Sequence, residues 1–151
     1  MSNFPTQVQT IQDEYYLHMI EDCAEEMYTC LRGPRPSSAI LVTLEGTAVF
    51  GGVYPPYGSP SCKDEGKCMI VDGHCVRNIH AEVNAILDCA SIGISTKGST
   101  LYSVNKPCYN CTIAAINAGI SRIVYRHAVY DEERTQNAIN NAGIECIKLG
   151  E

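Results

Sequence analysis

The chain has 151 residues, of which 45% are hydrophobic and 19% charged, and its formal net charge is −6. This length predicts a single domain over residues 1–151. The acidic balance argues against binding to polymeric DNA or RNA, and no apolar run approaches the ~20 residues of a membrane-spanning helix. We therefore expect a cytoplasmic protein that acts on a small molecule, with its nine cysteines as metal ligands or buried thiols rather than disulfides.

The N-terminal third predicts a long helix followed by a β-hairpin. Apolar residues recur at three- and four-residue steps, as on one buried helix face, at Val8, Ile11, Tyr15, Met19, Cys23, Met27 and Cys30. The Gly- and Pro-rich residues 33–36 end this pattern. Residues 39–44 and 47–50 flank Glu45-Gly46 and predict two antiparallel strands joined by a tight turn. Residues 51–61, rich in Gly, Pro and Tyr, predict a loop.

A cysteine-rich loop follows between residues 62 and 75. It carries four side chains that are soft metal ligands: Cys62, Cys68, His74 and Cys75. One explanation is a second, structural zinc ion that holds the loop in place, with Cys30 as an alternative to one of these ligands. The other explanation is a set of reduced cysteines that fill small apolar gaps.

The remaining residues alternate helices with strands. The expected order is helix 80–91, strand 100–104, helix 107–119, strand 122–125, helix 132–142 and strand 144–149. This alternation predicts an α/β fold, with a sheet whose later strands are parallel and with helices on both of its faces. Ligands of such sheets bind at the carboxyl ends of the strands, and the helices that begin at His80 and Cys108 start at that edge.

Two short motifs at these helix starts predict a catalytic zinc site. His80, Cys108 and Cys111 supply three ligands of the kind that zinc prefers and leave a fourth position for water. Glu82 would then lie beside that water as a proton carrier. In a regular helix His80 and Glu82 would point about 200° apart, so His80 must precede the first helical turn. The alternative is a structural zinc module with Cys and His ligands. The pattern His-x-Glu followed by Pro-Cys-x-x-Cys is similar to the signature of zinc-dependent nucleobase deaminases.

A wider set of segments resembles one branch of those enzymes, the deoxycytidylate (dCMP) deaminases of bacteria and phages. The matching segments are Gly73-His74-Cys75-Val76-Arg77, Ile79-His80-Ala81-Glu82, Asn84-Ala85-Ile86, Pro107-Cys108, Asn117-Ala118-Gly119-Ile120, Arg122-Ile123-Val124-Tyr125 and Asn141-Ala142-Gly143-Ile144-Glu145. The resemblance implies the three-layer α/β/α cytidine-deaminase-like fold, with a mixed five-stranded sheet. Its N-terminal hairpin would be antiparallel and its later strands parallel.

The resemblance also implies an activity, which is the hydrolytic deamination of dCMP to dUMP for thymidylate synthesis. Zinc would activate a water molecule, and Glu82 would move protons to N3 of cytosine and to the departing ammonia. We expect substrate contacts from Ala81 and, beyond the strand that follows the zinc-binding helix, from Arg126 and Tyr130. For Arg126 the alternative is an ordinary solvated side chain.

Regulation and assembly are implied in the same way. The family is typically homohexameric, activated by dCTP and inhibited by dTTP with Mg²⁺ at a separate nucleotide site. That site commonly uses a Gly-Tyr-Asn-Gly loop, which here reads Tyr54-Pro55-Pro56-Tyr57-Gly58. We expect effector contacts from Gly51, Tyr57 and Gly58. A tRNA adenosine deaminase would need basic surface, and a nucleotide sensor without chemistry would have no need of Glu82, so both alternatives fit less well.

Overall fold

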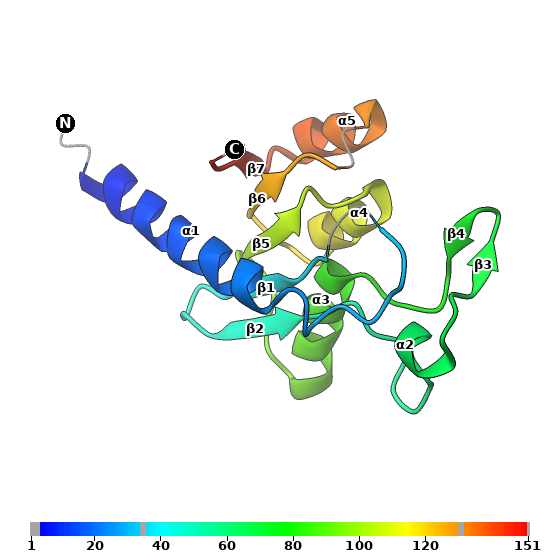
Figure 1. Cartoon of the computed structure of the whole chain (residues 1–151). Helices are drawn as coiled ribbons and strands as arrows, with labels where there is room; N and C mark the ends of the chain where they lie inside the picture. The colour runs from blue at the N-terminus through cyan, green and yellow to red at the C-terminus, as the bar shows by residue number, and fades with distance from the viewer. Residues whose placement is uncertain (1–3, 34–35, 130–131, 151) are drawn as a thin grey trace.

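The computed structural model describes residues 4–33, 36–129 and 132–150. Its centre is a five-stranded sheet with the strand order β2-β1-β5-β6-β7 (Figure 1). The strands are β1 (Ala39–Val42), β2 (Ala48–Gly51), β5 (Thr100–Asn105), β6 (Arg122–His127) and β7 (Glu145–Lys148). β1 runs antiparallel to both β2 and β5, whereas β5, β6 and β7 are parallel to one another. The predicted mixed sheet, with its hairpin and its later parallel strands, is confirmed.

Helices cover both faces of the sheet and complete the predicted three layers. One face carries α3 (Ala81–Ile92), α4 (Tyr109–Asn117) and α5 (Glu133–Ala142), and α1 (Phe4–Cys23) lies across the other. Because side chains alternate along a strand, neighbouring residues pack into two separate hydrophobic cores, one on each face of the sheet. Leu41 and Leu101 pack under α3, whereas Ile40 and Tyr102 pack under α1.

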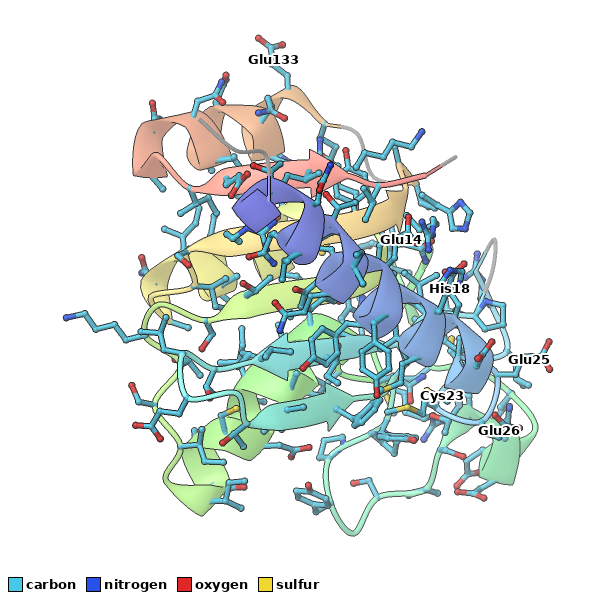
Figure 2. The ribbon with its side chains drawn as sticks, turned by 90° about the vertical axis from the view of Figure 1, so that its left-hand side faces the viewer. Glu14, His18, Cys23, Glu25, Glu26 and Glu133 are labelled. Atoms are coloured by element: carbon cyan, nitrogen blue, oxygen red, sulfur yellow. The ribbon has the colours of Figure 1, made fainter. Side chains whose placement is uncertain are left out.

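The predicted buried face of α1 is wrong over the first half of the helix, whereas Met19 packs against the core under α1 as predicted. The buried positions of this helix are Asp13, Leu17 and Ile20, and the helix ends at Cys23, just before the buried Ala24, instead of continuing toward Cys30. Val8, Ile11 and Tyr15 are 46%, 70% and 59% exposed. The reason is a buried polar contact, because Asp13 accepts hydrogen bonds from Tyr102 at 2.6 Å and from Arg122 at 2.9 Å. Figure 2 looks onto this face and shows α1 across the strands, with Glu14 and His18 on the same side of the helix.

The segment between β2 and α3 lies at the edge of the domain and is mostly exposed. It contains the short helix α2 (Cys62–Glu65) and a small hairpin of β3 (Ile70–Val71) and β4 (His74–Cys75), which projects from the rest of the molecule (Figure 1). Of residues 54–80, only Ser61 and Cys62 are buried. No helix in the described part of the chain is long and apolar enough to cross a membrane.

Candidate metal and catalytic site

Three metal-binding side chains meet where α3 and α4 begin. His80 is the N-cap of α3 and Cys108 the N-cap of α4, and both have extended backbones, with φ/ψ of −64°/150° and −65°/170°. Cys111 lies in the first turn of α4. His80 Nδ1 is 3.6 Å from Cys108 Sγ and 3.4 Å from Cys111 Sγ. The extended backbone at His80 is the geometry that the sequence predicted for a helix start.

These distances fit a tetrahedral zinc site. Zinc bonds of about 2.3 Å to sulfur and about 2.0–2.1 Å to nitrogen place adjacent nitrogen and sulfur ligands about 3.6 Å apart. All three ligand atoms lie within 4.8 Å of one another. Three protein ligands leave one tetrahedral position open, which is the arrangement of catalytic rather than structural zinc sites.

The protonation of the two thiols also suits a metal. A hydrogen bond from Cys111 lowers the pKa of Cys108 to about 4. Burial acts in the opposite direction, and the contact with His80 lowers this pKa further. The adjacent Cys108 and the nearby carboxylate of Glu82 raise the pKa of Cys111, and the contact with Cys108 raises the pKa of His80. Zinc binds cysteine as the thiolate, so the protons that these groups carry would leave when the metal binds.

Glu82 is held beside this group by a serine that the sequence analysis missed. The Glu82 side chain lies in the first turn of α3 and is 6% exposed. Ser103, fully buried in β5, donates a 2.6 Å hydrogen bond to Glu82 Oε1. The available signal was a serine between Tyr102 and Val104 in a buried strand, but this position does not by itself indicate the hydrogen-bond partner. The bond fixes the carboxylate next to the three ligands.

The start of α3 is also fixed by close backbone packing. A Cβ atom on Gly51 would lie 2.1 Å from the carbonyl oxygen of Ala81 and 2.6 Å from the amide nitrogen of Ala85. The side chain of Asn84 donates to the carbonyl oxygen of Gly52 at 2.8 Å. Gly51 therefore has a packing role at the start of α3, and its predicted effector contact stays a prediction. Ala81, a predicted substrate contact, is the buried first residue of α3.

Arg126 forms ion pairs with carboxylates of α1. Its guanidinium donates to Glu14 at 2.8 Å, to Glu21 at 3.1 Å and to the carbonyl oxygen of Leu149 at 2.9 Å, and these carboxylates raise its pKa. The side chain thus ties α1 to β6 and is not an ordinary solvated arginine, and its predicted substrate contact stays a prediction. Tyr130, another predicted substrate contact, lies outside the described residues.

The predicted effector loop reaches the surface near α3. Tyr57 is 92% exposed, and its hydroxyl donates to Asp88 of α3 at 2.9 Å. Gly58 has a φ of +84° in open space, a conformation that favours glycine.

The second predicted metal-binding group contains Cys30 in place of His74. Cys62, Cys68 and Cys75 lie together with Cys30, and their sulfur atoms are all within 4.8 Å of one another. His74 is exposed and is not part of this group. The correction follows from the alternation of side chains along β4, because His74 and Cys75 point to opposite sides of the strand.

Known proteins share both the sequence and the fold. Residues 10–127 match the family model described as the cytidine and deoxycytidylate deaminase zinc-binding region. ComE operon protein 2 of Bacillus subtilis is 35% identical over 121 residues, which cover 78% of this chain. Deoxycytidylate deaminase of Enterobacteria phage T4 is 42% identical over 73 residues, or 47% of this chain. The chain spans 64% and 37% of the lengths of these two relatives.

A solved structure extends the similarity over nearly the whole fold. The dCMP deaminase of cyanophage S-TIM5, in its apo form, superimposes with a TM-score of 0.71 and 25% sequence identity, covering 91% of this chain and 96% of the phage protein. The same phage protein has been crystallised with dCMP and dUMP, and that structure gives a TM-score of 0.72 at 24% identity over 90% of this chain and 95% of the phage protein.

Proposed function

This chain belongs to the family of cytidine and deoxycytidylate deaminases, and on that premise we propose that it converts dCMP and water to dUMP and ammonia with zinc as its cofactor. The observation that carries the proposal is the buried carboxylate of Glu82 beside His80, Cys108 and Cys111. A structural zinc module has no need of a buried carboxylate next to an open ligand position.

The reaction replaces the 4-amino group of cytosine with oxygen. It needs a nucleophilic water at C4, and protons for N3 and for the departing ammonia. Zinc held by His80, Cys108 and Cys111 supplies, when bound, the Lewis acidity that makes water nucleophilic near neutral pH. Glu82 accepts the protons that the water loses and donates them to N3 and to the amino group. Ser103 holds Glu82 Oε1, so the carboxylate keeps one orientation during both transfers.

The choice of dCMP among cytosine compounds is supported by the relatives. The phage T4 protein is a deoxycytidylate deaminase, and the cyanophage protein binds dCMP and dUMP. The net charge of −6 agrees with a small substrate rather than a nucleic-acid polymer. We infer that the product dUMP supplies thymidylate synthesis.

The test is ammonia release from dCMP, with CMP, cytidine and dCTP as comparison substrates. The control variant is Glu82→Gln, which keeps the shape of the side chain but cannot exchange protons. We expect dCMP to be the preferred substrate and the variant to lose about 10²–10⁴-fold in kcat, while its zinc content stays unchanged. Preference for cytidine would move the function to another member of the family. Absence of turnover, with or without dCTP, would favour a nucleotide sensor.

We extend the proposal to regulation by dCTP as activator and dTTP as inhibitor, each with Mg²⁺. The exposed loop at Tyr57 and Gly58 supports this, because the Tyr57 hydroxyl contacts α3 through Asp88. The rate should be measured against dCMP concentration with each effector, in the wild type and in Tyr57→Phe. We expect the variant to keep its basal rate and to respond less to the effectors. An identical effector response in the variant would remove Tyr57 from the site.

We also propose a homo-oligomer, a hexamer by resemblance. The support is the apolar stripe of Val8, Ile11 and Tyr15, which the chain leaves exposed on α1. Sedimentation velocity of the wild type and of Ile11→Glu tests this. We expect a hexamer that the substitution dissociates, whereas a monomeric wild type would contradict the proposal.

A further inference from the structure

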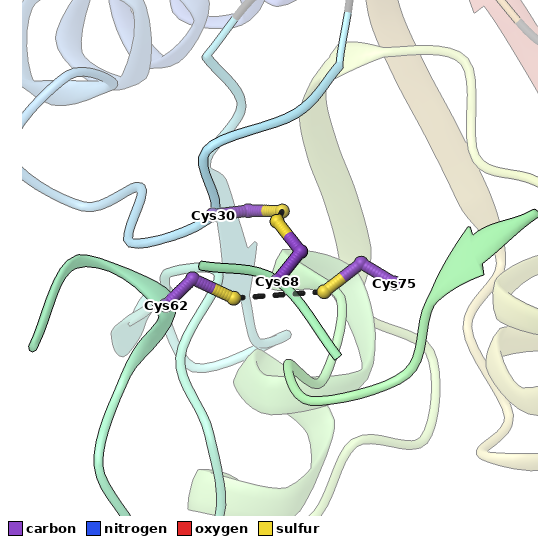
Figure 3. Close-up of side chains that lie close together, drawn as sticks. All are labelled: Cys30, Cys62, Cys68 and Cys75. Atoms are coloured by element: carbon purple, nitrogen blue, oxygen red, sulfur yellow. Dashed lines mark hydrogen bonds between the residues drawn. The ribbon is translucent and has the colours of Figure 1, made fainter. Parts of the chain in front are cut away.

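Four cysteine side chains converge from three parts of the chain. Cys30 lies in the segment after α1, Cys62 begins α2, Cys68 follows α2, and Cys75 ends β4. Figure 3 shows their sulfur atoms turned toward one another. The Sγ atoms of Cys30 and Cys68 are 3.8 Å apart, and those of Cys62 and Cys75 are 3.5 Å apart. All four sulfur atoms lie within 4.8 Å of one another.

These distances match a tetrahedral four-thiolate metal site. Zinc–sulfur bonds of about 2.3 Å at tetrahedral angles place neighbouring sulfur atoms about 3.8 Å apart. In a disulfide the two sulfur atoms are only about 2.0 Å apart, and all four of these cysteines are free. The arrangement is therefore that of metal ligands rather than of bonded pairs.

The surrounding segment has little else to hold it. Between residues 54 and 80 only Ser61 and Cys62 are buried, and the apolar residues of the β3–β4 hairpin, Met69, Ile70, Val71 and Val76, are 46–52% exposed. Hydrophobic burial therefore contributes little to fixing this stretch. Short segments of this kind are commonly stabilised by a structural metal ion.

We propose that Cys30, Cys62, Cys68 and Cys75 bind a structural zinc ion, distinct from the one at His80, and that this ion fixes the position of His80. The ion would join the segment after α1 to both ends of the cysteine-rich loop. All four tetrahedral positions are filled by sulfur, so no site remains for water and the ion has no part in chemistry.

Asn78 connects the four-cysteine group to the start of α3. Its side-chain amide donates to Cys62 Sγ at 3.3 Å, and its carbonyl oxygen accepts from Thr29 Oγ1 at 3.2 Å. The next residue, Ile79, donates its backbone N–H to the carbonyl oxygen of Tyr54 at 2.8 Å, and His80 follows. Asn78 is therefore a positioning residue, held by Cys62 on one side and two residues from His80, a ligand of the other site. This second part of the inference rests on the proposed function, whereas the metal site does not.

The first experiment is metal analysis of the wild-type chain purified without chelators, together with X-ray absorption at the zinc edge. We expect about two zinc ions per chain, with an average first shell of about three sulfur and one nitrogen or oxygen atoms per zinc. Cys75→Ser and Cys68→Ser should retain about one zinc with about two sulfur ligands. Cys146→Ser is the matched control, because Cys146 is a half-buried thiol outside both groups, and it should keep both ions.

One zinc per wild-type chain would overturn the metal site, as would disulfides between these cysteines in the freshly purified protein. Metal content is measured without substrate. Two zinc ions in a protein that does not deaminate dCMP would therefore contradict the proposed function and still support the four-cysteine metal site.

The positioning role is tested with Asn78→Ala, using exposed Asn141→Ala as control. We expect Asn78→Ala to keep the four-thiolate ion but to lose about 10-fold or more in zinc affinity at the His80 site or in kcat. Wild-type affinity and kcat in Asn78→Ala would show that the two sites are independent.

Discussion

Ser103→Ala tests how Glu82 is held for proton transfer. The substitution removes a buried hydroxyl that donates a 2.6 Å hydrogen bond to Glu82 Oε1. A hydrogen bond to a charged group contributes about 1.5–3 kcal/mol. If the carboxylate loses that amount of orientation energy in the transition state, kcat falls about 10- to 100-fold. The substrate does not touch Ser103 in this scheme, so KM for dCMP should change little.

The assay compares kcat, KM and zinc content in the wild type, Ser103→Ala and Ser99→Ala. Ser99 is a close control, because it lies immediately before β5, is fully buried, and its hydroxyl has no hydrogen-bond partner among the described residues. Ser99→Ala should leave kcat unchanged. A wild-type kcat in Ser103→Ala, or an equal loss in both variants, would refute the assigned role of this hydrogen bond.

Three further substitutions test the packing of the fold, one beside the site and two between α1 and the sheet. Gly51→Ala places a Cβ against the backbone of α3 and should lower the free energy of unfolding by about 1–3 kcal/mol in urea titrations, with a loss of zinc affinity; unchanged values would contradict the close approach. Asp13→Asn removes one partner of a buried ion pair and should cost about 3 kcal/mol. Burial raises the pKa of Asp13, but hydrogen bonds from Arg122, Tyr102 and Gln9 bring that pKa below its ordinary value. The stabilisation from the ionised Asp13 is therefore present above the pKa of the unfolded state and is lost as the pH falls through the pKa of the folded state. Asp13→Asn should show a weaker loss of stability in acid, and an acid transition like that of the wild type would contradict this role of Asp13. Arg126→Ala should lower stability by about 1–2 kcal/mol without changing KM for dCMP, and a raised KM would restore Arg126 as a phosphate ligand.

The local motifs could be predicted because their chemistry is confined to a few neighbouring residues. His80 and Cys108 begin helices as expected, since Asn78-Ile79 and Pro107 precede runs with clear helical spacing. The positions of the five sheet strands along the chain followed from hydrophobic segments of the right length, whereas α2, β3 and β4 lie in residues that were predicted as a loop. The structure agrees with the sequence where one segment specifies its own conformation.

The wrong predictions concern contacts between distant segments. The buried face of α1 depends on Asp13, whose burial is favourable only because Arg122 and Tyr102 lie opposite it in the folded sheet. The ion pairs of Arg126 were not predicted, because its carboxylate partners on α1 are more than one hundred residues away in the sequence. The same limit applies to Cys30, which only the fold brings beside Cys68.

The two helix starts that supply the ligands of the His80 site are separated in the sequence by β5, the central strand of the sheet. His80 and Cys108 are 28 positions apart, and β5 runs between them while pairing with β1 on one side and β6 on the other. We therefore expect the ligands to reach their final places only after β5 has paired with β1, a non-local pairing of the kind that forms slowly in folding. During refolding, recovery of tight zinc binding should lag behind the helical signal of α1, so that a loaded site marks a chain whose sheet is complete.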